Sequence, residues 1–159
     1  MLTYDLIQRI QSVYLLLALL LIGSLFFMDM ALLTSGTSNY SLTHLGILEI
    51  TTDGINMVMP AIALNILLWV TSIALVITIF LFKKRLLQIR IAGLTIGLLA
   101  GLAGLIFFFG KSGAKELSAE LSFTWAIVLP IVSIVFVVMA IRAIGKDEAL
   151  VKSLDRLRP

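Results

Sequence analysis

The sequence predicts an all-α membrane protein with four antiparallel transmembrane helices. Sixty per cent of its 159 residues are hydrophobic, 13% are charged, and the mean hydropathy is +1.12. These values lie well outside the range of soluble proteins. Helices of about 17–25 apolar residues cross a bilayer. The chain contains four stretches of about this length or longer without a charged residue: 12–28, 54–82, 91–110 and 121–141.

The distribution of charge predicts the orientation of these helices. An even number of spans places both termini on one side of the membrane. Ten of the twelve Lys and Arg residues then share that side with four of the nine acids, so the two sides carry +6 and −3. By the positive-inside rule both termini are cytoplasmic. The basic excess therefore has a role in orientation and requires no nucleic-acid partner.

The first span is expected over 12–28, after a short amphipathic segment at 1–11. A cleaved signal peptide is not favoured, because the segment before the apolar run is barely positive and no small-residue cleavage site follows Phe27. We therefore expect a single membrane domain over residues 1–159, with the first helix retained.

The first outer loop is expected over 29–59. Residues 34–39, Thr-Ser-Gly-Thr-Ser-Asn, have the composition of a loop. The β-prone runs 47–51 and 55–59 flank an Asp53-Gly54 pair, which is typical of a short β-hairpin. A hairpin alone is marginally stable, so it is expected to rest on the outer end of the helices.

The second and third spans are expected over 60–82 and 91–109, joined by a short basic link. Pro60 suits the first turn of a helix. In the third span, small residues recur on one helical face, which lets another backbone approach closely. Whether this face meets another helix of the chain or another protein stays open. The glycines of this predicted packing ridge are Gly93, Gly97, Gly101 and Gly104.

A second outer loop is expected over 110–122 and the fourth span over 123–144. Pro130, inside that span, predicts a kink because it removes the hydrogen bond to the Ala126 carbonyl. The cytoplasmic tail, 145–159, has a leucine stripe and mixed charges, which suits either an interfacial helix on anionic lipid or a protein-docking helix. The candidate docking residues are Arg142, Lys146, Asp147, Glu148, Leu150, Leu154, Asp155, Arg156 and Arg158.

No constellation of catalytic residues, metal ligands or cofactor-binding residues is evident in the sequence. The chain has no cysteine and one histidine, His44, which excludes thiolate and multi-histidine metal sites within one chain. Nothing joins Glu49 and Asp53 to His44 in an acid–base site, so an enzyme is not expected. Asn65 is the most polar side chain well inside a span. It is expected to form an interhelical hydrogen bond, and the alternative is a ligand in a substrate pathway.

Both ends of the chain resemble a family of small, four-span bacterial membrane proteins of unknown function. The resemblance lies in residues 7–18, Ile-Gln-Arg-Ile-Gln-Ser-Val-Tyr-Leu-Leu-Leu-Ala, and in 142–158, where Gly145 departs from the usual basic or polar residue. This glycine predicts a break between the fourth span and the tail. The resemblance implies a location in the bacterial inner membrane but supplies no activity.

The favoured hypothesis is a non-enzymatic accessory or scaffold subunit of a larger inner-membrane complex. Its expected partners are the lipid bilayer, other integral membrane proteins and a cytoplasmic partner at the tail. The alternative is a small four-helix transporter or carrier. Because no span contains an acid, its solute is expected to be uncharged or lipid-like.

Overall fold

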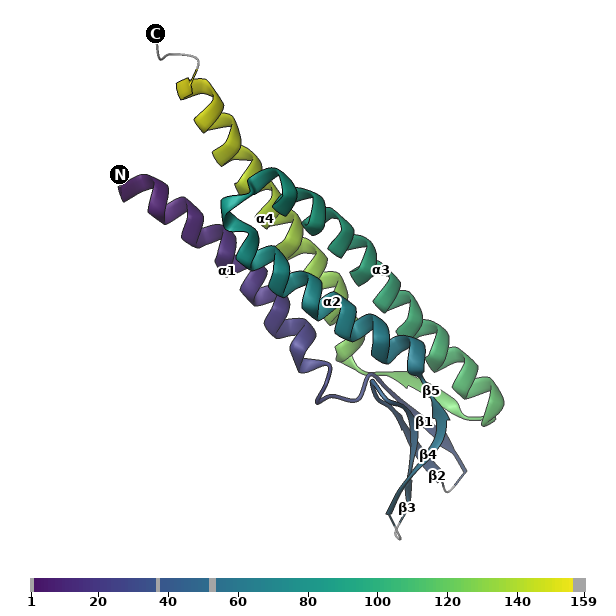
Figure 1. The fold of residues 1–159 in the computed structure, drawn as a ribbon. Coiled ribbons are helices and arrows are strands. Elements are labelled where there is room, and N and C mark those ends of the chain that lie inside the picture. The colour runs from purple at the N-terminus through teal and green to yellow at the C-terminus, as the bar shows by residue number, and fades with distance from the viewer. Residues whose placement is uncertain (1, 37, 52–53, 156–159) are drawn as a thin grey trace.

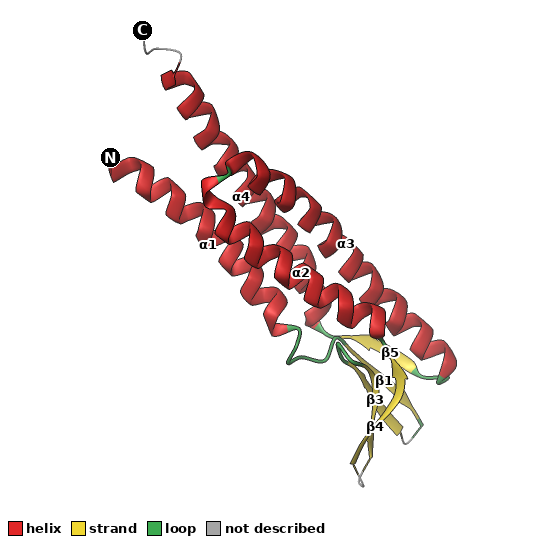
Figure 2. Ribbon diagram, viewed as in Figure 1, coloured by secondary structure: helices red, strands yellow, loops and turns green. Residues whose placement is uncertain are grey.

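The chain folds into four helices and a five-stranded antiparallel sheet, so the prediction of an all-α four-helix bundle is wrong (Figures 1 and 2). A computed structural model describes residues 2–36, 38–51 and 54–155, and among these the side chains of 10–36, 38–51, 54–82, 84–146 and 149. The helices are α1 (Leu2–Ser24), α2 (Ile62–Phe80), α3 (Arg85–Glu116) and α4 (Val128–Asp155), with short 3-10 turns η1 (Leu81–Lys83) and η2 (Trp125–Ile127). The strands are β1 (Ala31–Ser35), β2 (Ser38–Leu42), β3 (Gly46–Thr51), β4 (Gly54–Pro60) and β5 (Glu120–Phe123).

Two hairpins make up most of the sheet. The predicted hairpin is present as β3 and β4, where Thr51 pairs with Gly54. The segment expected to be a loop, 34–39, instead joins β1 to β2, with Ser35 opposite Ser38 and Gly36 at φ +57°. Glycine adopts this positive φ without the steric cost of a Cβ atom. The loop-like composition of 34–39 therefore marks the connection between two strands, and Thr34, Ser35, Ser38 and Asn39 are themselves in those strands.

The fifth strand comes from the other connection on the same side of the helices. Within 110–122, expected to be a loop, α3 continues to Glu116 and β5 begins at Glu120. β5 pairs with β1, which gives the strand order β4-β3-β2-β1-β5. Both connections thus fold into one sheet at one end of the helices, here called the sheet end (Figure 1).

The four helices pack in a ring in which α1 and α3 each contact both α2 and α4. Among the described residues, α2, α3 and the segment Trp125–Lys146 are long and apolar enough to cross a membrane, while the apolar part of α1, Ile10–Ser24, is shorter. These lengths are compatible with a membrane protein. The start of α1 and the end of α4 lie opposite the sheet, at the end here called the termini end (Figure 1).

The core of the ring is mostly aliphatic, with a few polar links between helices. Leu15, Leu68, Leu99 and Val137 are fully buried, one from each helix. Gln88 of α3 donates from Nε2 to the Thr78 carbonyl oxygen of α2 at 3.0 Å. Ser133 of α4 lies 3.5 Å from the Ala18 carbonyl oxygen of α1 and 2.8 Å from that of Leu129.

Pro60, Pro130 and Gly145 differ from their predicted roles. Pro60 ends β4, and α2 begins two residues later. Pro130 lies in the first turn of α4, since that helix begins at Val128 and not at 123. The first-turn N–H groups of a helix have no intrahelical partner, so a proline there removes no such bond and the expected kink has no cause. α4 also continues through Gly145 to Asp155, so the predicted break is absent.

Candidate functional site

The four glycines of the predicted packing ridge face outward from α3. All four are exposed, and a Cβ atom added to Gly93, Gly97 or Gly104 would meet nothing within 4 Å. At Gly101 it would lie 3.5 Å from Cδ2 of Leu67, an ordinary contact. α3 packs on its neighbours through the opposite side, with Ala92, Thr95, Leu99, Leu102 and Ile106 buried. The alternative that other helices of this chain fill the ridge therefore has little support, and contact with another protein stays a prediction.

Two other glycines of α3 do make close contacts, and the sequence analysis missed them. A Cβ atom at Gly110 would lie 2.8 Å from Cε1 of Phe123, and one at Gly113 would clash with Cδ1 of Ile47. Both glycines are buried where the helix crosses β5 and the inner face of the sheet. Their position beyond the predicted span hid this role, because the sheet that needs them was not predicted.

Asn65 does not make the expected contact through its Oδ1 atom. This atom is buried and has no hydrogen-bond partner among the described residues. The hydroxyls of Thr71, Ser72 and Thr95, in α2 and α3, each donate to the carbonyl four residues earlier in their own helix. Ser133 of α4 likewise donates to the Leu129 carbonyl. The expected interhelical hydrogen bond is therefore not formed by the Asn65 Oδ1 atom, and the alternative, a ligand in a substrate pathway, stays a prediction.

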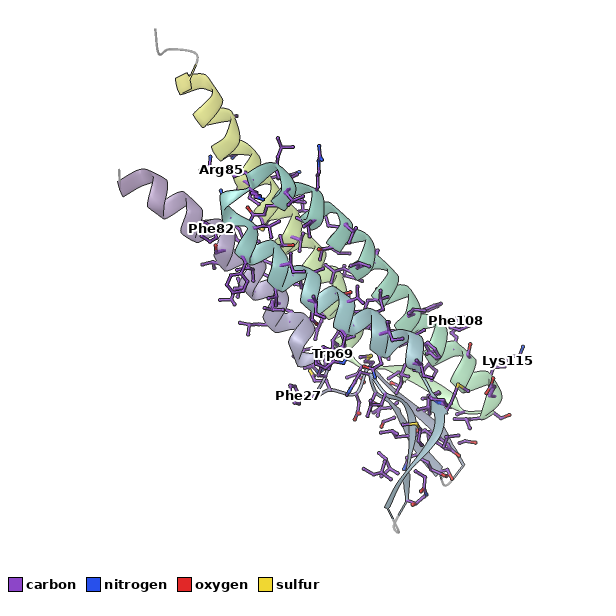
Figure 3. All side chains as sticks on the ribbon, in the orientation of Figure 1. Phe27, Trp69, Phe82, Arg85, Phe108 and Lys115 are labelled. Atoms are coloured by element: carbon purple, nitrogen blue, oxygen red, sulfur yellow. The ribbon has the colours of Figure 1, made fainter. Side chains whose placement is uncertain are left out.

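His44 lies in a small cavity at the sheet end. The cavity, of about 210 Å³, is lined by Phe26, Phe27, Met28, Asp29, Thr43, His44, Leu45 and Leu48. The His44 ring packs edge-on against Phe26 at 5.4 Å, and Phe26 lies 4.9 Å from Trp69. Desolvation in this apolar setting lowers the pKa of His44. Phe27 and Trp69 are labelled in Figure 3, toward this end of the helices.

The arrangement around His44 does not form an acid–base site. Glu49 follows on β3, opposite Tyr40 and Asn56, and does not line the cavity, while Asp53 lies outside the described residues. Over the described part of the chain, no group of three or more His, Asp or Glu side chains is placed to hold a metal ion. The cavity therefore offers one imidazole, one carboxyl group and an apolar wall.

The candidate docking residues of the tail are only partly described. Arg142 and Lys146 are exposed on α4. The side chains of Asp147, Glu148, Leu150, Leu154 and Asp155, and residues Arg156 and Arg158 altogether, lie outside what the structure describes. The docking interpretation of the tail stays a prediction.

The sheet has an exposed apolar face that the sequence analysis did not anticipate. Directly opposite residues of an antiparallel pair lie on the same face. One face of the sheet therefore carries four such pairs: Ile50–Ile55, Leu48–Met57, Ser41–Leu48 and Leu32–Ser41. On it Leu32, Ile50, Ile55 and Met57 are between 46% and 70% exposed, whereas Ser41, which lies between Leu32 and the other three, is buried. The exposed apolar part of this face is therefore mainly the hairpin of β3 and β4. Apolar patches of this kind are typical of interaction surfaces.

Comparison with known proteins identifies a family and no activity. Residues 7–157 match the model of a domain of unknown function, DUF4293. No curated protein matches the chain.

Proposed function

The chain belongs to the DUF4293 family, an uncharacterised one, and from this premise we propose that it is a non-enzymatic accessory or scaffold subunit of a larger complex in the bacterial inner membrane. The observation that carries the proposal is the outward glycine ridge of α3, formed by Gly93, Gly97, Gly101 and Gly104. The expected partner is a transmembrane helix of another protein.

The four glycines of the ridge lower the stability of α3 on their own. A glycine within a helix costs about 1 kcal/mol relative to alanine. Three of the four make no contact within the chain that an alanine would disturb. In lipid, close backbone approach and van der Waals packing drive helix association, and a glycine face permits both. A helix from another protein that packs on this face would therefore offset the stability that the glycines cost α3.

The proposed orientation follows from the basic residues at the ends of the helices. The basic residues of the α2–α3 link, Lys83, Lys84 and Arg85, lie at the termini end, and Figure 3 shows Arg85 there. The positive-inside rule then assigns the termini end to the cytoplasm and the sheet to the opposite side of the membrane. The exposed apolar face of the sheet offers the same partner a second contact outside the bilayer.

A carrier of an uncharged or lipid-like solute is the second candidate. It is favoured by one observation, the buried Asn65 Oδ1 atom without a hydrogen-bond partner. Buried polar atoms without partners are rare and commonly have a role. Solute flux in proteoliposomes that disappears in Asn65→Leu would raise this candidate above the accessory role.

The test of the accessory role is co-purification at native expression. The tagged protein is extracted in mild detergent, and proteins recovered with it are identified by mass spectrometry. We expect an integral membrane partner whose recovery falls at least tenfold in Gly93→Leu/Gly97→Leu. The matched control is Gly23→Leu in α1, where an added Cβ atom also meets nothing within 4 Å. Recovery of only the bare protein or its homo-oligomer, or equal recovery from both variants, contradicts the proposal.

A further inference from the structure

A cavity of about 270 Å³ lies between α1 and α4 toward the termini end. Its position follows from the register of the two helices, in which Tyr14 stacks on Phe136 at 6.4 Å and Ser133 reaches the Ala18 carbonyl. The volume is several times the roughly 30 Å³ that one water molecule occupies in the liquid. The lining residues are Ile10, Tyr14, Met139, Arg142, Ala143 and Lys146.

The wall of this cavity combines two cations with an apolar surface. Arg142 and Lys146 are four residues apart on α4 and therefore lie on the same side of the helix, one turn apart. Among the side chains that the structure describes, Arg142, Lys146 and the Tyr14 phenol are the ionisable groups that line the cavity. Ile10, Met139 and Ala143 supply the apolar part. A ligand that matches both features carries an anionic group and a hydrocarbon chain.

The height of the two cations along α4 matches the edge of a bilayer. Counted from Val128 at the sheet end, Arg142 is about 21 Å and Lys146 about 27 Å along the helix, at ~1.5 Å per residue. The hydrocarbon of a bilayer is about 30 Å thick. Long basic side chains at this depth extend toward the headgroups while their stems stay on apolar surface. Their charged groups then lie where lipid phosphates are found.

We propose that this cavity binds an anionic phospholipid of the leaflet at the termini end. Arg142 and Lys146 contact its phosphate, and Ile10, Met139 and Ala143 contact the start of an acyl chain. Basic pockets between transmembrane helices on the cytoplasmic side bind such headgroups in general. The apolar wall favours a lipid over free phosphate, which would leave that wall without a contact. The inference does not depend on the accessory role, since it involves a different helix face.

The test is lipid-dependent thermal stability of the full-length protein in a neutral detergent. Phosphatidylglycerol, phosphatidylcholine and inorganic phosphate are added separately, and the unfolding midpoint is followed by tryptophan fluorescence. We expect phosphatidylglycerol to raise the midpoint and to remain bound in native mass spectrometry, whereas the other two have little effect. Arg142→Gln/Lys146→Gln is expected to lose this shift and to reduce the bound lipid at least fivefold.

Two further variants separate the cavity from general charge attraction. Ala143→Phe keeps both cations but fills the space between the helices, so it is expected to lose the shift as well. Lys84→Gln/Arg90→Gln removes two exposed cations that lie outside the cavity. This variant is expected to keep the shift of the unfolding midpoint with phosphatidylglycerol. The proposal is overturned by an equal shift with phosphatidylcholine or inorganic phosphate, or by a shift that survives Ala143→Phe. It is also overturned by an equal loss in the Lys84/Arg90 variant. Midpoints without added lipid show whether each variant is folded.

Discussion

The side chain of Ile47 in β3 packs directly against the backbone of α3 at Gly113. Ile47 is fully buried, and the space next to Gly113 is too small for a Cβ atom. Leu33 of β1 lies beside the same glycine, at 3.5 Å from the Cβ position. The last turns of α3 thereby hold the inner face of the sheet, and the sheet and helices share one hydrophobic core.

Gly113→Leu is expected to destabilise the protein by about 1–3 kcal/mol, since a larger side chain must displace Ile47 and Leu33. Unfolding in detergent, followed by tryptophan fluorescence, measures the change. Ile47→Ala in the same chain makes room, so the double variant is expected to lose less than the sum of the single variants. Gly104→Leu, in open space on the same helix, is the control and is expected not to destabilise. Equal losses at positions 113 and 104 contradict the contact.

The stability of the sheet end is expected to decrease as the pH falls below 6.5, the ordinary pKa of histidine. Burial lowers the pKa of His44 in the folded state, so the unfolded state binds the proton more readily. The contribution of neutral His44 is therefore complete above pH 6.5 and is lost below it. Hydrogen exchange of the β3 amides at pH 5.5 and 8 measures this loss. In His44→Gln the part of the pH dependence due to this residue is expected to disappear.

His44 is the only histidine of the chain, so its titration can also be followed directly by the imidazole NMR signal. A midpoint at or above 6.5 contradicts the apolar environment described for it.

Replacement of Pro130 is expected to have little effect. The residue lies in the first turn of α4, where its missing N–H has no intrahelical acceptor. Pro130→Ala should change the free energy of unfolding by less than about 1 kcal/mol. In contrast, Ala140→Pro in the interior of the same helix should cost about 3 kcal/mol or more. A large gain of stability in Pro130→Ala would show that Pro130 lies in the interior of the helix, and therefore that α4 begins earlier than Val128.

Single cysteines test the proposed orientation, because the natural chain contains none. Ile55→Cys lies on β4 at the sheet end, where Ile55 is 70% exposed, and Lys84→Cys lies at the termini end. A membrane-impermeant maleimide added to bacterial cells with permeabilised outer membranes should label the first and not the second. Disruption of the inner membrane should make both reactive. The opposite labelling pattern contradicts cytoplasmic termini.

The helices were largely predictable because long apolar runs are a strong local signal. The sheet was not, since its strands are short and their patterns ambiguous. In β1, Ala31 and Leu33 are buried while Leu32, equally apolar, is exposed, so the alternation of burial is hidden in the sequence. β5 is four residues long, and its partner β1 is separated from it by two helices. No local pattern indicates such a pairing.

The candidate site shows a similar division. Glycine spacing identified one face of α3, but spacing alone does not say whether that face points inward or outward. In the structure the side of α3 with Ala92, Leu99 and Ile106 is buried in the core, so the glycine face points outward. The cavity between α1 and α4 is formed by residues far apart in the chain, Ile10 and Tyr14 with Arg142 and Lys146. Only the antiparallel register of those two helices brings them together.

The pairing of β5 with β1 also sets an order for biogenesis. The ribosome releases β1 to β4 before α2, whereas β5 follows only after α3. In the proposed orientation, α2 and α3 must be inserted and the next segment translocated before β5 can pair with β1. Until then β1 has an open edge and Gly110 lacks the Phe123 ring that covers it. The pairing of β5 with β1 is therefore a late step in folding. A chain stalled after α3 would expose the unpaired edge of β1 to chaperones and proteases on the side of the membrane where the sheet lies.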